Sequence, residues 1–183
     1  MNKSKTIRII GGSLKNSKIR IVEEGIKPTT DRVRVTLFNW LHAWIANKRV
    51  LDLFAGSGIL GLEALSRDSE EVIFIERSKK ASMALDQQLA KFQIDNCKNK
   101  QVDAIQFLEQ KNKEARFDII FLDPPFDQVN YESLLSAIRA QDLLATDGKI
   151  YLETDKRTEI MLSKKQVVLK DKPIGDVRLM ILQ

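Results

Sequence analysis

The residues with the clearest chemical potential form the turn Asp123-Pro124-Pro125-Phe126, which directly follows a run of four apolar residues, 119–122. Such a run is typical of a parallel strand covered on both faces. The two prolines end the strand because each lacks an N–H and fixes φ. A carboxylate, a rigid carbonyl and an aromatic ring are therefore presented together. They lie at the strand's carboxyl end, where open α/β sheets bind ligands.

An Asp-Pro pair alone is more typical of a capped turn, but the apolar strand before it and a glycine loop upstream favour a functional interpretation. The Asp123 carboxylate and the Pro124 carbonyl can accept the two N–H groups of an exocyclic amine and direct its lone pair at an electrophile. Phe126 can stack on a nucleobase, a contact worth about 1–3 kcal/mol. A base inside a helix cannot reach such a turn, so the nucleotide must be single-stranded or flipped out.

A second signature lies upstream, where the expected strand 50–54 leads into the loop Gly56-Ser57-Gly58. Together with Gly61 the glycines fit the pattern G-x-G-x-x-G, in which the backbone approaches a ligand closely because no Cβ intervenes. Glu76 follows at the end of the next strand, where an acid can bind two ribose hydroxyls. This pattern alone fits a dinucleotide and S-adenosylmethionine equally well.

Three features favour S-adenosylmethionine. Asp52 lies inside the first strand of the pattern, where it can face the amino-acid tail of that cofactor. Asp103 ends the third strand and can read an adenine edge, although an Asp there also caps the following helix well. The acidic turn supplies a substrate function that hydride transfer does not need. The predicted cofactor-binding residues are Asp52, Phe54, Ala55, Gly56, Ser57, Gly58, Glu76, Asp103 and Ala104.

From residue 49 onward, strand and helix patterns alternate, which predicts an α/β fold with a mostly parallel sheet and helices on both faces. The expected strands are 50–54, 71–76, 99–102, 118–122, 149–153, 166–169 and 177–182. The expected helices are 60–66, 79–92, 104–110, 131–140 and a weaker one at 156–162. The last two strands lack a long helix between them, so we expect an antiparallel pair that turns near residues 171–173.

The first 48 residues are expected to form a basic extension of a single domain that spans residues 1–183. Two β-favouring runs, 6–10 and 18–22, predict a hairpin with one apolar and one basic face. A helix is expected from about residue 30 to about residue 46. This extension holds ten Lys and Arg against three acidic residues, a net charge of +7, whereas the whole chain carries +5.

A basic arm on a near-neutral body favours a polyanionic partner over an ordinary solvated surface. The residues predicted to contact such a polyanion, RNA included, are Arg8, Lys18, Arg20, Thr30, Arg32 and Arg34. The single Cys97 and single His42 predict neither a disulfide nor a metal site. No apolar run approaches a membrane span and no signal peptide opens the chain, so we expect a cytoplasmic protein without membrane contact, and a monomer.

The chain resembles the bacterial 16S ribosomal RNA (guanine-N2)-methyltransferases of the RsmD type over nearly its whole length. The resemblance rests on Arg8-Ile9-Ile10-Gly11-Gly12, on residues 27–34 (KPTTDRVR), on residues 51–58 (LDLFAGSG) with 61–67 (GLEALSR), and on Asp123-Pro124-Pro125-Phe126. It implies a class I methyltransferase (Rossmann-like) seven-stranded sheet with an antiparallel last strand, and S-adenosylmethionine as cofactor. It further implies a guanine of the assembled or assembling small ribosomal subunit as substrate.

Carried over by motif, the resemblance implies that Asp52, Gly56, Gly58, Glu76 and Asp103 contact cofactor and that residues 123–126 contact the target base. The family often has Arg where this chain has Lys27, and Glu where it has Val35. Three other functions stay open. The turn also suits methylation of DNA adenine or cytosine amines. A basic RNA-binding assembly factor with a vestigial cofactor pocket is a non-catalytic alternative. A dinucleotide oxidoreductase is the least favoured.

Overall fold

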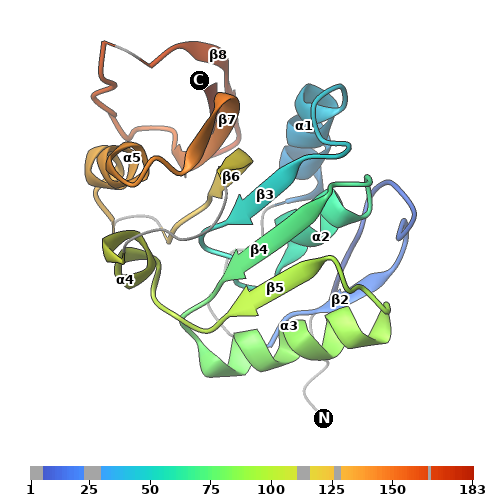
Figure 1. The fold of residues 1–183 in the computed structure, drawn as a ribbon. Coiled ribbons are helices and arrows are strands. Elements are labelled where there is room, and N and C mark those ends of the chain that lie inside the picture. The colour runs from blue at the N-terminus through green and yellow to red at the C-terminus, as the bar shows by residue number, and fades with distance from the viewer. Residues whose placement is uncertain (1–5, 23–29, 111–115, 126–128, 165) are drawn as a thin grey trace.

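The computed structural model describes residues 6–22, 30–110, 116–125, 129–164 and 166–183. Figure 1 shows a central twisted sheet with helices on both of its faces. The strands are β1 (Thr6–Arg8), β2 (Lys18–Arg20), β3 (Arg49–Asp52), β4 (Glu71–Ile75), β5 (Cys97–Lys100), β6 (Phe117–Leu122), β7 (Leu144–Asp155), β8 (Val168–Ile174) and β9 (Val177–Leu182). The helices are α1 (Asp31–Leu41), α2 (Ile59–Leu65), α3 (Lys79–Lys91), α4 (Ala104–Glu109) and α5 (Tyr131–Ala140).

Within these described ranges, seven strands form the main sheet in the order β5-β4-β3-β6-β7-β9-β8, and β1 and β2 form a separate antiparallel hairpin. The pairs from β5 to β7 are parallel, whereas β9 runs antiparallel to both β7 and β8. The predicted α/β sheet with an antiparallel last strand is thus confirmed. None of the helices in the described ranges is long and apolar enough to cross a membrane.

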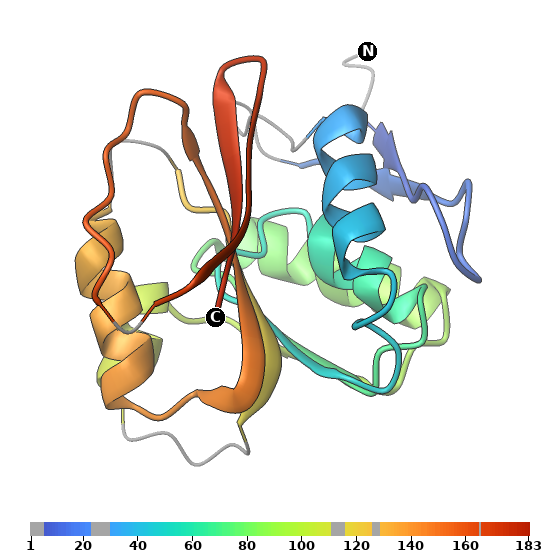
Figure 2. The same ribbon diagram turned by 90° about the horizontal axis from the view of Figure 1, so that it is seen from above.

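The two faces of the sheet carry separate apolar clusters because alternate strand residues point to opposite sides. The hairpin, α1, α2 and α3 pack on one face, which we call the arm face, and α4 and α5 pack on the other (Figure 2). Along β6, Phe121 belongs to the arm face, and Leu122 belongs to the opposite face. Along β7, Tyr151 and Leu152 divide in the same way.

Three expected elements differ from those observed. Residues 156–162 form no helix, because a turn at Asp155–Arg157 follows β7 directly. The segment 171–173 is not a turn but part of β8, and the chain reverses instead near Gly175, whose φ of +64° suits glycine. The first helix ends at Leu41 rather than near residue 46. Its start is as expected, since the Thr30 hydroxyl accepts the Val33 N–H at 3.4 Å.

The loop of the hairpin docks on the last turn of α2. The Ser13 N–H donates to the Ser66 carbonyl at 2.7 Å, and the Leu14 N–H donates to the Ser66 hydroxyl at 2.9 Å. That hydroxyl in turn donates to the Gly11 carbonyl at 2.6 Å. Since the last carbonyls of a helix lack partners within the helix, the hairpin supplies one for α2. Gly12 makes the approach possible, because its φ is +74° and a Cβ there would lie 1.6 Å from the Ser66 carbonyl oxygen.

A buried ion network joins the hairpin, α1 and α2. Glu63, at 0% exposure, accepts the Ile10 N–H at 2.8 Å, pairs with Arg67, and lies 3.5 Å from the guanidinium of Arg34. Arg34 is also 0% exposed and pairs with Asp31 at 2.6 Å. The expectation that Arg34 contacts RNA is therefore corrected, because its guanidinium is fully buried and its charge is paired with Asp31 and Glu63. Arg34 instead holds α1 against α2.

This docking predicts that Gly12→Ala destabilises the protein far more than Gly175→Ala. Both glycines have positive φ, but a Cβ at Gly12 meets backbone, whereas a Cβ at Gly175 meets nothing within 4 Å. We expect Gly12→Ala to lower the free energy of unfolding by more than about 2 kcal/mol and Gly175→Ala by about 1 kcal/mol. Urea unfolding of the two variants measures the difference, and equal losses would contradict the docking described above.

Candidate active site

Four carboxylates lie at the carboxyl ends of neighbouring strands. Going across the sheet they are Glu76 after β4, Asp52 at the end of β3, Asp123 after β6 and Glu153 near the end of β7. The register pairs Asp52 with Phe121 and Leu122 with Leu152, so each acid stands near its neighbour's strand end. By the alternation of each strand, all four side chains are directed to the arm face. We call this arrangement the carboxylate row.

Glu76 organises the glycine loop. Its Oε2 accepts the Gly56 N–H at 2.7 Å, and its Oε1 accepts the Ser78 N–H at 2.6 Å. These two hydrogen bonds connect the end of β4 to the loop and to the start of α3. Glu76 is only 9% exposed. Because each carboxylate oxygen has two lone pairs, Glu76 keeps acceptor capacity for hydroxyl donors while it holds the loop.

Asp52 caps a helix from a neighbouring strand. Its Oδ2 accepts the Gly61 N–H at 3.0 Å, in the first turn of α2, where the N-cap Gly58 has no side chain to offer. The pKa of Asp52 is raised to about 7. Burial is the main cause, the hydrogen bond from Gly61 acts in the opposite direction, and the negative charges of Asp123 and Glu76 add to the rise. Asp52, Asp123 and Glu76 therefore influence one another electrostatically. A cation bound there would relieve the repulsion.

The acidic turn begins at this edge. Asp123 is partly buried, Pro124 is buried and Pro125 is exposed. The carbonyl of Phe121 accepts the Leu53 N–H at 3.2 Å, which ties the strand before the turn to the strand before the glycine loop. The β3–β6 register therefore places Asp123 near Asp52, at the same edge of the sheet. Phe126 lies outside the described residues.

The remaining predicted cofactor residues line the same edge. Phe54 and Ser57 are partly buried and Ala55 is buried, within the loop that follows β3. Asp103 follows β5 and caps α4, with its Oδ1 accepting the Ile105 N–H at 2.8 Å and the Gln106 N–H at 3.4 Å. Its capping role is thus observed, and an additional adenine contact stays a proposal. Ala104 is buried behind it.

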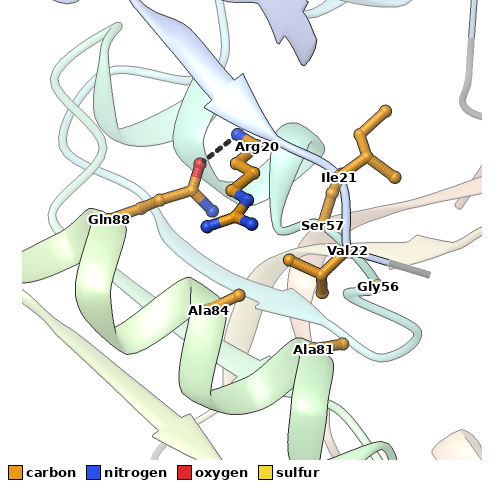
Figure 3. A pocket seen from close by; sticks show the side chains of 8 residues that line it. All are labelled: Arg20, Ile21, Val22, Gly56, Ser57, Ala81, Ala84 and Gln88. Carbon is orange, nitrogen blue, oxygen red and sulfur yellow. Dashed lines mark hydrogen bonds between the residues drawn. The ribbon is translucent and has the colours of Figure 1, made fainter. Parts of the chain in front are cut away.

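The end of the hairpin forms one wall of a small pocket beside the glycine loop (Figure 3). The other walls are Gly56 and Ser57 of the loop and Ala81, Ala84 and Gln88 of α3. The Arg20 N–H donates to the Gln88 amide oxygen at 2.8 Å, which fixes the strand end to the helix. The basic arm and the glycine loop are therefore parts of one surface, although they are far apart in the sequence.

The exposed face of the hairpin is strongly basic. Arg8 and Lys18 are directly opposite in the β1–β2 register, Arg20 follows on the same face, and all three side chains are exposed. Like charges directly opposite on a hairpin are destabilising, so folding alone does not explain the arrangement. Arg32 is also exposed at the start of α1, where Thr30 is the N-cap. These side chains are available to a polyanion.

The sequence reasoning missed Glu153. It is 4% exposed, and its Oε2 accepts the hydroxyl of Tyr151 at 2.7 Å. The signal was present, because an acid that directly follows the apolar run of a central strand is unusual. It was overlooked because Tyr-Leu-Glu reads as an ordinary strand end, and only the pairing of β7 with β6 places it beside the turn. Among the described residues, no group of three or more His, Cys, Asp or Glu has the arrangement to hold a metal ion.

Comparisons with known proteins point in one direction. The model of a family described as conserved hypothetical protein 95 matches residues 7–183. A relative from Haemophilus influenzae, named ribosomal RNA small subunit methyltransferase D, is 37% identical, with 97% of this chain and 93% of the relative covered. The solved structure of the putative methyltransferase YhhF from Escherichia coli is 36% identical, with a TM-score of 0.88 and 98% of both chains covered.

A more distant structure, the putative methyltransferase SMU.776 complexed with S-adenosylhomocysteine, has a TM-score of 0.76 at 14% identity. All of this chain but only 56% of that one is covered. At this identity the likeness shows the fold alone.

The raised pKa of Asp52 predicts how stability depends on pH. Between about pH 4 and pH 7 the unfolded chain has lost the Asp52 proton while the folded chain retains it, so this residue's contribution to stability falls as pH rises. Above pH 7 Asp52 is ionised in the folded chain as well, and its burial then lowers the free energy of unfolding by the full amount, roughly 4 kcal/mol. Asp52→Asn keeps an acceptor for Gly61 without the charge. We therefore expect it to be more stable than the wild type at pH 8 and equally stable near pH 4.

Urea unfolding of wild type and Asp52→Asn at pH 4, 6 and 8 measures this gap. Asp147→Asn, the same substitution at an exposed site, serves as the control. A stability difference of the same size at all three pH values would show that Asp52 is not held neutral by burial.

Proposed function

Since the chain belongs to the family described as conserved hypothetical protein 95, we propose that it methylates the exocyclic N2 amine of a guanine in 16S ribosomal RNA. A relative in this family is named a ribosomal RNA small subunit methyltransferase, so the chain is an S-adenosylmethionine-dependent rRNA methyltransferase. The observation that carries the assignment to an amine is the β3–β6 register, which pairs Asp52 with Phe121 and so places a cofactor-type acid beside the acceptor turn.

The residues at the carboxylate row fit the cofactor. Gly56 and Gly58 both have positive φ and leave the loop backbone without side chains, as a closely approaching cofactor requires. A Cβ at Gly58 would lie 2.4 Å from Leu85, so this glycine also lets the loop pack against α3. Glu76 retains acceptor capacity for the ribose hydroxyls. Asp52 faces the amino-acid tail, and the positive charge of that tail would lower its raised pKa and favour the ionised carboxylate. When bound, S-adenosylmethionine supplies a methyl group activated by its positively charged sulfur. These residue roles are proposals.

We propose that the turn prepares the nucleophile. The lone pair of a guanine amine is delocalised into the ring and is therefore a poor nucleophile. The Asp123 carboxylate and the Pro124 carbonyl accept its two N–H groups, which localises electron density on nitrogen and aims it at the methyl group. Pro124 and Pro125 hold the carbonyl in place, and such positioning is a large part of the rate. The proton released on methylation leaves to Asp123 or to water.

The basic arm provides the RNA surface in this proposal. Arg8, Lys18 and Arg20 form a cationic face, and the end of the same hairpin borders the glycine loop. Phosphates bound by the hairpin would therefore lie near the cofactor edge, with the target base flipped or single-stranded at the turn. The substrate is proposed to be the small subunit or an assembly intermediate, with the monomeric enzyme acting in the cytoplasm.

A labelled methyl group from S-adenosylmethionine tests the substrate directly. We expect incorporation into small ribosomal subunits that lack the modification, and none into duplex DNA. Digestion of the labelled RNA to nucleosides should yield N2-methylguanosine as the labelled product. Labelled N6-methyladenine or N4-methylcytosine in DNA would instead establish the alternative DNA reaction.

The turn mechanism predicts that Asp123→Ala separates catalysis from cofactor binding. Loss of one preorganised hydrogen-bonding group in an active site lowers the rate by about 100- to 1000-fold. We therefore expect methyl transfer to small subunits to fall by about 100-fold or more, with cofactor affinity by isothermal titration within a few-fold of normal. Asp147→Ala, at an exposed site on β7, is the control. A matching loss of cofactor affinity would make Asp123 a structural residue.

The arm predicts a change in salt dependence. Arg8→Gln and Arg20→Gln each remove one exposed charge from the hairpin face. Because each lost phosphate contact reduces the slope of log affinity against log salt by about 0.7–0.9, the double variant should bind small-subunit RNA more weakly and with a shallower slope. Lys170→Gln, on edge strand β8, should leave the slope unchanged. An unaltered slope in the double variant would remove the hairpin from the RNA interface.

A further inference from the structure

Glu153 is a buried acid at the carboxylate row for which the mechanism above has no role. It follows Leu152, the partner of Leu122 in the β6–β7 register, so it stands beside Asp123 on the next strand. Burial raises the pKa of Tyr151, and the charges of Glu153 and Asp123 raise it further, as their neighbouring positions in the register lead one to expect. At 4% exposure, Glu153 cannot be an ordinary solvated strand end.

Its carboxylate is held in a fixed orientation. The Tyr151 hydroxyl donates to Oε2 at 2.7 Å, and Tyr151 itself is 0% exposed. Its ring packs edge-on against Phe121, with centroids 6.1 Å apart, and Phe121 packs in the same way against Phe38 of α1. Phe38, Phe121 and Tyr151 thus form a row of packed rings on the arm face that leads from α1 to Glu153, which we call the aromatic column. A carboxylate supported in this way is preorganised rather than adaptable.

The position of Glu153 assigns it to the substrate side of the site. The predicted cofactor residues follow β3, β4 and β5, all on one side of β6. The acceptor turn follows β6, and Glu153 lies on β7, on the other side of that turn. A group bound between Asp123 and Glu153 would therefore face the turn and not the cofactor strands.

We propose that Glu153 is a specificity residue that accepts the N1–H of the target guanine while Asp123 and Pro124 accept the N2 amine. This inference rests on the proposed function and deepens it. On guanine, N1–H and the N2 amine are adjacent on one edge and are all donors. Two neighbouring acceptors on β6 and β7 match that edge. Tyr151 is the positioning residue that aims the Glu153 carboxylate.

The same arrangement rejects other amines. In adenine and in cytosine, the ring nitrogen next to the exocyclic amine is an acceptor, so its lone pair would face the Glu153 carboxylate. Two acceptors brought together in a buried site leave both unpaired, which is costly. An Asp-Pro-Pro turn alone binds any exocyclic amine. The acid on the adjacent strand would make it selective for guanine.

A base analogue removes this contact. 2-Aminopurine keeps the 2-amine of guanine, has an acceptor in place of N1–H and also lacks the O6 carbonyl, so the contact is reported by the change in the guanine preference when Glu153 is substituted. Small subunits are reconstituted with guanine or 2-aminopurine at the target position, and the kcat/KM for methyl transfer is measured on each. We expect the wild type to favour guanine by on the order of 10- to 100-fold, the range for loss of one specific base contact.

Glu153→Gln is the matching variant of the protein. The side-chain oxygen of the glutamine can still accept the hydrogen bond from the Tyr151 hydroxyl. Its amide NH2 then faces the base as a donor where the carboxylate was an acceptor. We expect the preference for guanine over 2-aminopurine to fall by about tenfold or more, or to reverse. Tyr151→Phe, which keeps the aromatic column, should reduce the preference to a smaller extent. Glu159→Gln, an exposed Glu with the same change of charge, should keep the wild-type ratio.

Two results would overturn the proposal. The first is that the wild-type enzyme methylates both substrates equally well, a result that can be obtained without any variant. The other is a Glu153→Gln enzyme that loses activity on both substrates by the same factor, since this would make Glu153 structural. Failure of the proposed function is distinct from both, because the wild type would then transfer no methyl group to the guanine-containing subunit.

Discussion

The structure depends on one electrostatic constraint: four carboxylates are kept close together at one edge of a parallel sheet, where water is largely excluded. Folding does not favour this, since burial and mutual repulsion raise the pKa of Asp52 to about 7. Backbone N–H groups offset part of the cost, from Gly61 to Asp52 and from Gly56 and Ser78 to Glu76. The remaining cost of burying these carboxylates would be offset by ligands that bring hydrogen-bond donors and positive charge to this edge. A sulfonium cofactor and the amine edge of guanine both meet that description.

The remainder of the chain places a second surface beside this edge. The hairpin is fixed to α2 through Ser66 and Glu63, and to α3 through Gln88. Each anchor is buried or partly buried and satisfies a backbone group, so the outward side chains need not contribute to stability. This division explains how Arg8 and Lys18 can stand opposite each other on a short hairpin. The anchoring network is structural, and the cationic face is left for the proposed contact with RNA.

The sheet and the two site motifs were predictable from sequence because both are local signals. Apolar runs ended by Gly56 and Pro124 mark strand ends, and parallel strand ends must share an edge. The errors came from tertiary contacts that sequence patterns do not report. Arg34 reads as part of a basic cluster, but Glu63, distant in sequence, draws it into the core. Residues 156–162 read as a weak helix, but β7 continues further than expected and turns at once. Glu153 became visible only through the pairing of β6 with β7, a non-local contact.

The central claim is that the acceptor turn grips an amine directly in front of the cofactor's methyl-bearing sulfur. A crystal structure of the protein with S-adenosylhomocysteine and guanosine tests it most directly. The account predicts N2 of the guanine at about 3 Å from both an Asp123 carboxylate oxygen and the Pro124 carbonyl oxygen, with N2 facing the sulfur. Guanine bound with its amine turned away from the sulfur, or cofactor bound away from Asp52 and Gly56, would contradict it.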